Sequence, residues 1–225
     1  MTGISGINSM WWALRGIPVT IVDEERDRID LIKRVWKDVS LEANIVYQPR
    51  GEFPVPIGDK AFDMSWNFAS LWFVLDLGRF LGELTRITNK VIFLCVPNRL
   101  GVGHISRLVF QEESDHPLHS ENIIPLRIKD IMHKLRWRVF EQGFLDTPPW
   151  PDIAMKKEDL LQRIGLKRVA DRFRDKNERM CILDYYSGKK KNMENEILKY
   201  AFLENSPWIV RRFWAHHEFF IFTRS

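Results

Sequence analysis

Two segments give the clearest indication of the fold: residues 58–68, Gly58-Asp59-Lys60-Ala61-Phe62-Asp63-Met64-Ser65-Trp66-Asn67-Phe68, and residues 91–98, Val91-Ile92-Phe93-Leu94-Cys95-Val96-Pro97-Asn98. Short apolar runs rich in β-branched residues are typical of buried parallel strands, and two are predicted here, at Phe62–Asn67 and Lys90–Asn98. A helix is predicted between them because apolar residues recur at helical spacing, at Leu71, Val74, Leu77, Leu81 and Leu84. This strand, helix and strand predict parallel pairing.

The same alternation extends toward the N-terminus. Two further strands are predicted at Pro18–Asp23 and Asn44–Tyr47, and one helical face between them carries Ile29, Ile32, Trp36 and Val39. A short helix is predicted from Asn8 to Arg15, ended by Gly16 as its left-handed cap and by Pro18. We therefore expect an α/β protein with right-handed crossovers and helices on both faces of its sheet.

The C-terminal half is less regular. We predict a helix over Ile123–Leu135, a strand over Trp137–Phe144 and a final strand over Glu218–Thr223. Three prolines between Asp146 and Asp152 exclude helix and sheet interior there. Helical patterns recur at 153–165, 196–203 and 208–215, around a highly charged stretch at 166–195 that favours an insertion or a cover. The expected organisation is one domain over residues 1–225, with an irregular helical insertion at about residues 153–215.

The bulk composition is that of a globular protein: 45% of the 225 residues are hydrophobic and 28% charged. No apolar run approaches the roughly 18 residues of a membrane span, and Met1–Arg15 lacks the pattern of a signal peptide. Cys95 and Cys181 fit core thiols in a reducing compartment, so a cytoplasmic location without membrane contact is expected.

The net charge of +4 permits an acidic partner. Lys189–Lys191 fits a solvated loop better than a nucleic-acid contact.

The ordered set of segments resembles the class I S-adenosylmethionine (SAM)-dependent methyltransferases. Gly58–Phe68 is similar to the fourth-strand motif of that family, and Val91–Asn98 is similar to its fifth strand. The glycine loop, first helix and second strand have counterparts in Gly3-Ile4-Ser5, Ala13–Gly16 and Val19–Asp23, while Trp137–Phe144 and Glu218–Thr223 match the last two strands. The resemblance implies a Rossmann-like methyltransferase fold, whose mostly parallel sheet has an antiparallel last strand.

The sequence departs from the family at its N-terminal end. A complete member has a first strand ending in an acidic residue, and then a Gly-x-Gly, before the position of Gly3. Only Met1 and Thr2 stand there in this chain. In the family that strand is central in the sheet, between the second and fourth strands. We therefore expect a fold without the first strand and part of the glycine motif: the true start lies upstream, another segment fills the gap, or the chain is a remnant.

Cofactor-binding residues are predicted from the glycine loop and the strand ends. Glycines before a helix let backbone N–H groups approach a ligand at the positive end of the helix. An acid at the tip of the next strand can accept hydrogen bonds from both ribose hydroxyls, and ligands of open α/β sheets bind at the carboxyl ends of the strands. The predicted SAM-binding residues are Gly3, Ile4, Gly6, Asp23, Asn67 and Phe68.

The acceptor is predicted to bind at the same edge, through Asn98, Asp146 and Trp150. An antiparallel last strand brings its amino end there, so His216 and His217 are the catalytic candidates for taking a proton from an acceptor atom.

Structural alternatives stay open for these residues. Asn67 and Asn98 also fit turn formers, and the two histidines fit cations at a helix C-terminus. The segment Pro148–Pro151 fits a rigid connector as well as a pocket wall. His104, His116 and His119 lie in a loop that could bind metal, but their spacing matches no metal signature, and no metal is predicted.

Three functions remain open from the sequence. The first is SAM-dependent methyl transfer to a small molecule, by holding the acceptor in line with the methyl group. The second is a non-catalytic binding or scaffold protein of the same fold. The third is an RNA methyltransferase, suggested by the basic residues Lys167, Arg168, Arg172 and Arg174, and ranked last because the chain lacks an Asn-Pro-Pro-aromatic motif at the fourth strand. Oligomerisation is also possible.

Overall fold

The computed structural model describes residues 6–105, 118–147, 182–189, 195, 198 and 201–224. The strands are β1 (Thr20–Asp23), β2 (Asn44–Tyr47), β3 (Phe62–Phe68), β4 (Thr88–Pro97), β5 (Trp137–Leu145) and β6 (His217–Arg224). The α-helices are α1 (Ile7–Leu14), α2 (Arg26–Asp38), α3 (Leu77–Ile87), α5 (Pro125–Lys134), α8 (Ile182–Tyr186) and α10 (Trp208–Trp214). Three 3-10 helices are also described: η1 (Leu71–Phe73), η2 (Ser120–Ile123) and η3 (Ala201–Asn205).

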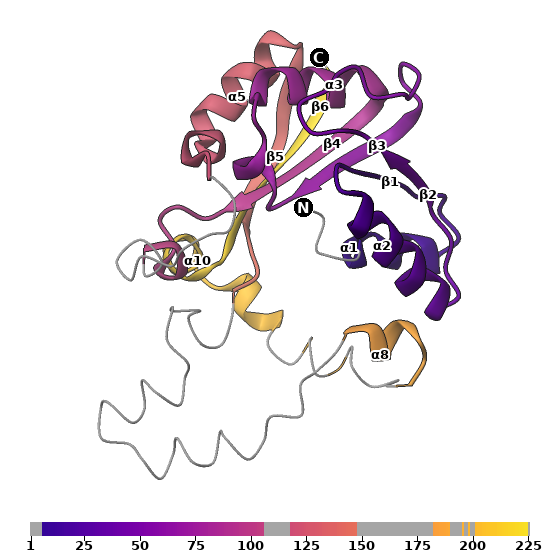
Figure 1. Cartoon of the computed structure of the whole chain (residues 1–225). Helices are drawn as coiled ribbons and strands as arrows, with labels where there is room; N and C mark the ends of the chain where they lie inside the picture. Colours follow the sequence, from indigo (N-terminus) through magenta and orange to yellow (C-terminus); the bar gives the residue numbers. More distant parts are fainter. Residues whose placement is uncertain are drawn as a thin grey trace.

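The strands form two separate sheets. β1 and β2 make a parallel pair in which Thr20 lies opposite Asn44. The other four strands follow the order β3-β4-β6-β5, with β3 parallel to β4 and β6 antiparallel to both of its neighbours. Figure 1 shows these four strands side by side, with β1 and β2 beyond the edge of β3. The predicted antiparallel last strand is therefore confirmed, and the predicted strands are present with ends that differ by two residues at most.

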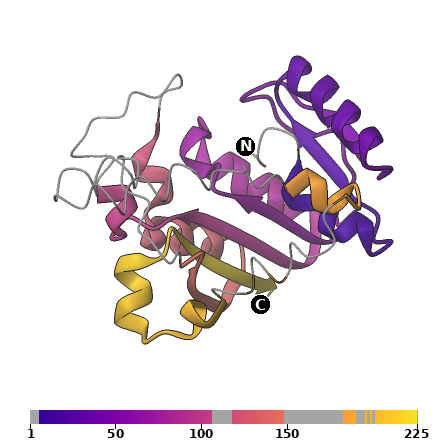
Figure 2. The same cartoon turned by 90° about the horizontal axis from the view of Figure 1, so that it is seen from below.

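The larger core lies between the four-stranded sheet and the helices α3 and α5. Alternate residues of β4 and β6 point into it and are fully buried: Ile92, Leu94, Val96, Phe220 and Phe222. Leu77, Leu81 and Leu84 of α3 and Ile128 and Met132 of α5 meet them from the helices. The two helices therefore cover one face of this sheet, and Figure 2 shows the sheet from below with α10 beyond its edge.

A smaller core joins α1 and α2 to β1, around Met10, Ile21, Ile32 and Trp36. Gly6 caps the N-terminus of α1 in the left-handed conformation, with φ +65°. A Cβ atom at Gly6 would lie 2.8 Å from Cδ1 of Ile21, so only glycine fits where the start of α1 approaches β1.

Three predictions need correction. The helix predicted from Leu71 is divided into η1 and α3, because the side chain of Asp76 accepts a hydrogen bond from the N–H of Arg79 and caps a new helix. The four parallel strands are not all buried on both faces, since β2 has no buried residue and Met64 of β3 is 39% exposed. The helix predicted at 196–203 does not remain α-helical to its end, because the chain forms a 3-10 helix, η3, from Ala201 onward.

Much of the predicted insertion, including the helix at 153–165, lies outside the described residues. Its last predicted helix, at 208–215, corresponds to α10. In the described part of the chain, no helix combines the length and the apolar character that crossing a bilayer requires.

Candidate active site

Two histidines share one carboxylate where β5 ends and β6 begins. Nδ1 of His216 lies 3.1 Å from Oδ2 of Asp146, and Nδ1 of His217 lies 3.4 Å from the same oxygen. The antiparallel register sets this arrangement, because Leu145 lies opposite His217 and the N–H of His216 donates to the carbonyl of Asp146. Asp146 adopts a left-handed backbone conformation, with φ +64°, which aspartate tolerates better than most residues.

The neighbouring imidazoles favour the ionised form of the Asp146 carboxylate. The hydrogen bond from His216 and the close approach of His217 hold the pKa of Asp146 well below its usual range, against an opposing effect of burial. Burial raises the pKa of the neighbouring Cys95 thiol, and the charge of Asp146 raises it further. Cys95 is therefore a protonated thiol at neutral pH and is not suited to accept a proton in this cluster.

Phe68, the last residue of β3, connects this cluster to the next strand end. Its ring centroid lies 4.9 Å from that of His217. Asn67, one residue earlier, points to the opposite face of β3 and is buried. Its side-chain amide donates to the hydroxyl of Ser70, and its carbonyl oxygen lies 3.4 Å from the N–H of Ser70. Asn67 thus stabilises the turn that leaves β3, which is the structural role that the sequence left open.

Asp23 lies at the carboxyl end of β1, as its position in the sequence predicts, and is 6% exposed. Its Oδ1 accepts a hydrogen bond from the N–H of Glu25 and lies 3.4 Å from Nε of Arg28. Arg28 is itself buried and also pairs with the carboxylate of Glu25. These contacts fix the orientation of the Asp23 carboxylate and satisfy part of its hydrogen-bonding capacity, so any ligand hydroxyl would bind beside Arg28.

A cavity of about 640 Å³ lies between β1 and β3. This volume falls within the range of about 300–1,000 Å³ that is common for ligand pockets. Its polar lining at the carboxyl ends of the strands includes Asp23, Arg50, Asn67 and Ser70.

Arg50 was not predicted from the sequence as a site residue. It donates from Nη2 to the carbonyl of Phe73 at 2.7 Å and so joins the chain after β2 to the chain after β3. Its position just beyond β2, at the expected ligand edge, is the signal that could have identified it.

The remaining predicted residues have different surroundings. Asn98 is 2% exposed, and its amide group donates to the carbonyls of Arg212 and Ala215, while its oxygen accepts from the N–H of Leu100. It therefore ties the end of β4 to the chain before β6. Gly6 packs against Ile21 and Trp36, as described above.

Gly3, Ile4 and Trp150 lie outside the described residues, as does His116 of the histidine-rich loop. Within the described ranges, no three histidine, cysteine or acidic side chains form a group that could hold a metal ion.

No protein-family model and no curated protein matches the sequence. Solved structures do match. A SAM-dependent methyltransferase from Archaeoglobus fulgidus superposes with a TM-score of 0.54 at 14% identity, over 98% of this chain and 82% of that one. A geranyl diphosphate methyltransferase in complex with GPP and sinefungin gives 0.54 at 14% identity, over 100% and 70% of the two chains. The [4+2]-cyclase SpnF gives 0.54 at 9% identity, over 99% and 72%.

These similarities define the fold. The chain has the α/β, Rossmann-like fold of class I SAM-dependent methyltransferases, as the sequence predicts. At such low identity the likeness does not extend to the reaction. A protein described as a [4+2]-cyclase shares the fold, so the function has to be argued from the residues of the site.

Proposed function

We propose that this protein is a SAM-dependent methyltransferase that acts on a small-molecule acceptor. The observation that carries the proposal is the convergence of its predicted residues at the carboxyl end of β3. Asn67 lines the same cavity as Asp23, while the next residue, Phe68, contacts His217. Because Asn67 and Phe68 point to opposite faces of β3, a cofactor held beside Asn67 and an acceptor held beside the histidines would approach each other around the carboxyl end of this strand.

The cofactor would bind along the mouth of the cavity. Asp23 is suited to the ribose hydroxyls, because its buried carboxylate is held in place by Arg28 and the N–H of Glu25. The turn into α1, with Gly3, Ile4 and Gly6, would approach the ligand through its backbone N–H groups, and Asn67 and Phe68 would bound it at β3. SAM supplies a methyl group on a positively charged sulfur. The polar lining of the cavity suits this cofactor, with the carboxylate of Asp23 on one side and the amide of Asn67 and the hydroxyl of Ser70 on the other.

The acceptor would bind beside the histidines, with Asp146, Trp150 and the turn held by Asn98 forming its site. Asp146 orients the imidazole of His216 by a hydrogen bond at Nδ1 and lies 3.4 Å from Nδ1 of His217. His217, which contacts Phe68, would take the proton that an acceptor oxygen or nitrogen loses on methylation, and His216 would support it. The main catalytic contribution would be to hold the acceptor in line with the methyl group.

The first test is calorimetric titration of the purified chain with SAM and with S-adenosylhomocysteine. We expect micromolar binding that Asp23→Asn weakens at least about tenfold, a loss of about 1.4 kcal/mol. The matched control is Asp30→Asn, which removes an exposed carboxylate from α2 and should leave the affinity unchanged. A folded wild-type sample that binds neither compound would refute the cofactor assignment.

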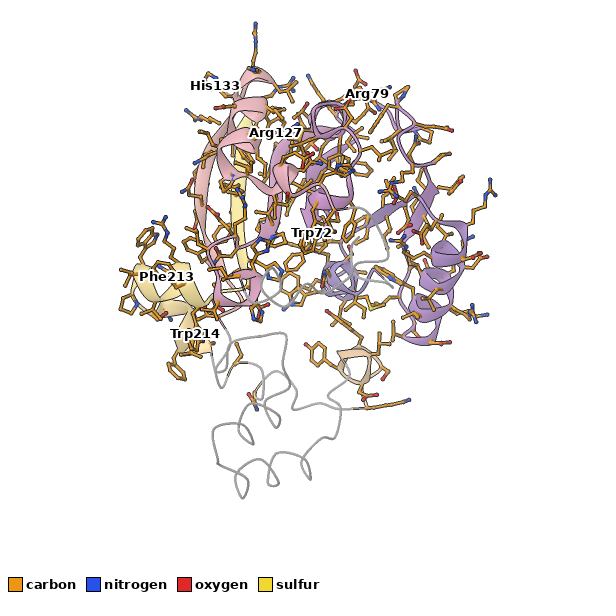
Figure 3. The ribbon with its side chains drawn as sticks, turned by 60° about the vertical axis from the view of Figure 1, so that its left-hand side comes forward. Trp72, Arg79, Arg127, His133, Phe213 and Trp214 are labelled. Carbon is orange, nitrogen blue, oxygen red and sulfur yellow. The ribbon has the colours of Figure 1, made fainter. Side chains whose placement is uncertain are left out.

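The second test measures S-adenosylhomocysteine formation across a panel of small oxygen and nitrogen nucleophiles. His217→Gln should lower kcat about 10²-fold, as expected for loss of a general base, with SAM affinity unchanged. His133→Gln is the control, because Figure 3 shows His133 at the far end of α5, away from this edge. Equal rates for the two variants would remove His217 from the mechanism.

A non-catalytic binding protein is the second candidate. The ion pair between Asp23 and Arg28 favours it, because a carboxylate already engaged by a buried arginine has less capacity for a ribose. The titration separates the two functions: a folded chain without affinity for SAM supports the non-catalytic candidate. Arg28→Met distinguishes them further, since it should tighten SAM binding if Arg28 competes with the ribose and should change nothing if no SAM binds.

A further inference from the structure

The helix before β6 presents apolar side chains to solvent. All seven residues of α10 are described, and none of them is buried. The exposed fraction is 59% for Ile209, 44% for Val210 and 48% for Phe213. Their spacing places these three side chains on one face of the helix. Figure 3 shows Phe213 and Trp214 at the outer margin of the described fold. A surface helix usually turns its apolar face toward the core, so the orientation of α10 is reversed.

The main chain fastens α10 to the fold and leaves this face outward. The side-chain amide of Asn98 donates to the carbonyls of Arg212 and Ala215 near the end of the helix. On the inner side, Trp208 and Arg211 line a hollow of about 230 Å³ with residues of β5 and β6. These contacts use backbone groups and one side of the helix only. They therefore fix the direction of the apolar face without covering it.

The residues of this region have the composition of a membrane-surface helix. The helix begins and ends with tryptophan, its only charged residues are Arg211 and Arg212, and the sequence from Asn205 to His217 contains no acidic residue. The guanidinium of Arg212 lies 4.8 Å from the ring centroid of Trp208. Tryptophan, large apolar side chains and arginine occur together in helices that lie in a membrane interface, where the rings sit at the level of the headgroups.

Charge separates a lipid surface from two other occupants of this face. In a symmetric contact with a second copy the same patch meets itself, so the arginines of the two copies would be brought together. The longest segment outside the described residues, 148–181, carries nine basic and six acidic residues and so has the same sign of charge as α10. An anionic bilayer supplies both the acyl chains for the apolar face and the phosphates for the arginines.

We propose that α10, together with Phe202 of η3, is the surface by which this protein docks on an anionic lipid bilayer. Phe202 directly precedes this region and is 66% exposed. The helix would lie along the interface, with Ile209, Val210 and Phe213 at the boundary of the acyl chains and Arg212 at the lipid phosphates. The sequence-based expectation of no membrane contact rested on the lack of a spanning run, which does not bear on a surface contact.

This inference does not depend on methyl transfer, because it concerns a face of α10 and no residue of the candidate active site. It does bear on the acceptor. His216 and His217 follow α10 almost directly, so docking would bring the edge of the sheet that carries them to the lipid surface.

The test is co-sedimentation of the full chain with vesicles of phosphatidylcholine, with and without phosphatidylserine. We expect affinity for the anionic vesicles to be at least about tenfold higher, and to fall as salt is added. Ile209→Ser combined with Phe213→Ser removes two outward apolar side chains and should weaken binding at least about tenfold. Leu126→Ser, a change of a residue on α5 that is 65% exposed, is the matched control and should bind as wild type does.

A second pair of variants tests the charge. Arg212→Gln should weaken binding to the anionic vesicles about fivefold at low salt, because one arginine near the surface loses its attraction to the lipid phosphates. Arg127→Gln on α5 should leave the affinity unchanged. Equal affinity of these two variants would remove the arginine from the contact.

Other results would overturn the proposal as a whole. Failure of the folded wild-type chain to bind either vesicle would refute it, and equal affinity of the double variant and Leu126→Ser would place the contact elsewhere. A dimer seen by light scattering without vesicles, and dissociated by the double variant, would assign the face to a second copy. Without vesicles, a lower urea midpoint for the double variant than for Leu126→Ser would show that another segment of this chain covers the face.

Discussion

Oδ2 of Asp146 lies 3.1 Å from Nδ1 of His216, and the backbone N–H of His216 donates to the carbonyl of the same aspartate. Two residues 70 positions apart are thus joined through both side chain and main chain. The side-chain contact aligns an imidazole at the edge of the sheet, and the main-chain contact extends the pairing of β5 with β6 by one step. The predicted catalytic group and the fold therefore depend on the same pair of residues.

The first prediction concerns the pH dependence of this pair. Because the folded state depresses the pKa of Asp146, its stabilising effect is fully present above the usual aspartate pKa of about 3.9 and is lost as the pH falls through the lower folded value. Asp146→Asn should therefore lower the free energy of unfolding at pH 6 by about 1 kcal/mol. This value is small because solvent screens the charge of a half-exposed carboxylate. In urea titrations from pH 6 to pH 3 the difference from wild type should shrink as the pH falls. Asp130→Asn, on the exposed side of α5, should show no such trend.

The second prediction tests the close approach at Gly6. Gly6→Ala adds a methyl group 2.8 Å from Cδ1 of Ile21 and forces alanine into a left-handed conformation. Gly16→Ala, with φ +74° and no atom within 4 Å of the added carbon, keeps the conformational cost of roughly 1–2 kcal/mol and removes the clash. Urea unfolding should show Gly6→Ala to be less stable than Gly16→Ala by a further 1–3 kcal/mol or so. Equal losses would contradict the packing described here.

The third prediction separates structure from function at Asn98. Asn98→Ala leaves the carbonyls of Arg212 and Ala215 without their donor and should cost about 2 kcal/mol of unfolding free energy. Amide exchange at the start of β6 should accelerate with it. Asn44→Ala, at an exposed position in β2, should change stability by less than about 0.5 kcal/mol. If Asn98→Ala is as stable as that control, Asn98 is free to serve the acceptor directly.

The fourth prediction addresses the chain between β2 and β3. Arg86→Lys keeps the charge but cannot reproduce the forked contacts with Val55, Ile57 and Asp59, so it should cost about 1–2 kcal/mol. Limited proteolysis should become faster within residues 49–61. Arg127→Lys, on the surface of α5 in Figure 3, is the matched control and should leave both measurements unchanged. Unaltered cleavage in Arg86→Lys would show that other contacts hold this segment.

The local spacing of apolar residues, glycines and prolines was sufficient to predict most of the helices and strands. Asn44–Tyr47 is predicted with the bounds of β2, and Gly16 ends the first helix in the left-handed conformation that its position indicates. The periodic apolar residues from Leu71 onward predicted one helix, but the cap at Asp76 divides that segment. Periodicity reports which side chains face the core, and it cannot show where the backbone turns between two segments that share a face.

The positions of the candidate site residues in the fold were predicted in part. Asp23 lies at the strand end where the alternation of strand and helix predicts it, and the two histidines lie at the amino end of the antiparallel last strand, as its direction predicts. The sequence could not show that Asp146 contacts both imidazoles, because that contact depends on the register of β5 against β6. Nor could it show the ion pair of Arg28 with Asp23, since Arg28 looks like any charged residue at the start of an amphipathic helix.

The sequence by itself determined the order of strands and helices, because the spacing of apolar residues and the positions of glycine and proline are local properties of the chain. It also determined which residues stand at the carboxyl ends of the strands. Only the tertiary structure decided that β1 and β3 face each other across a cavity, and that one aspartate orients two histidines. Both relationships join segments far apart in the chain, and such contacts arise from packing and strand register, which no local pattern encodes.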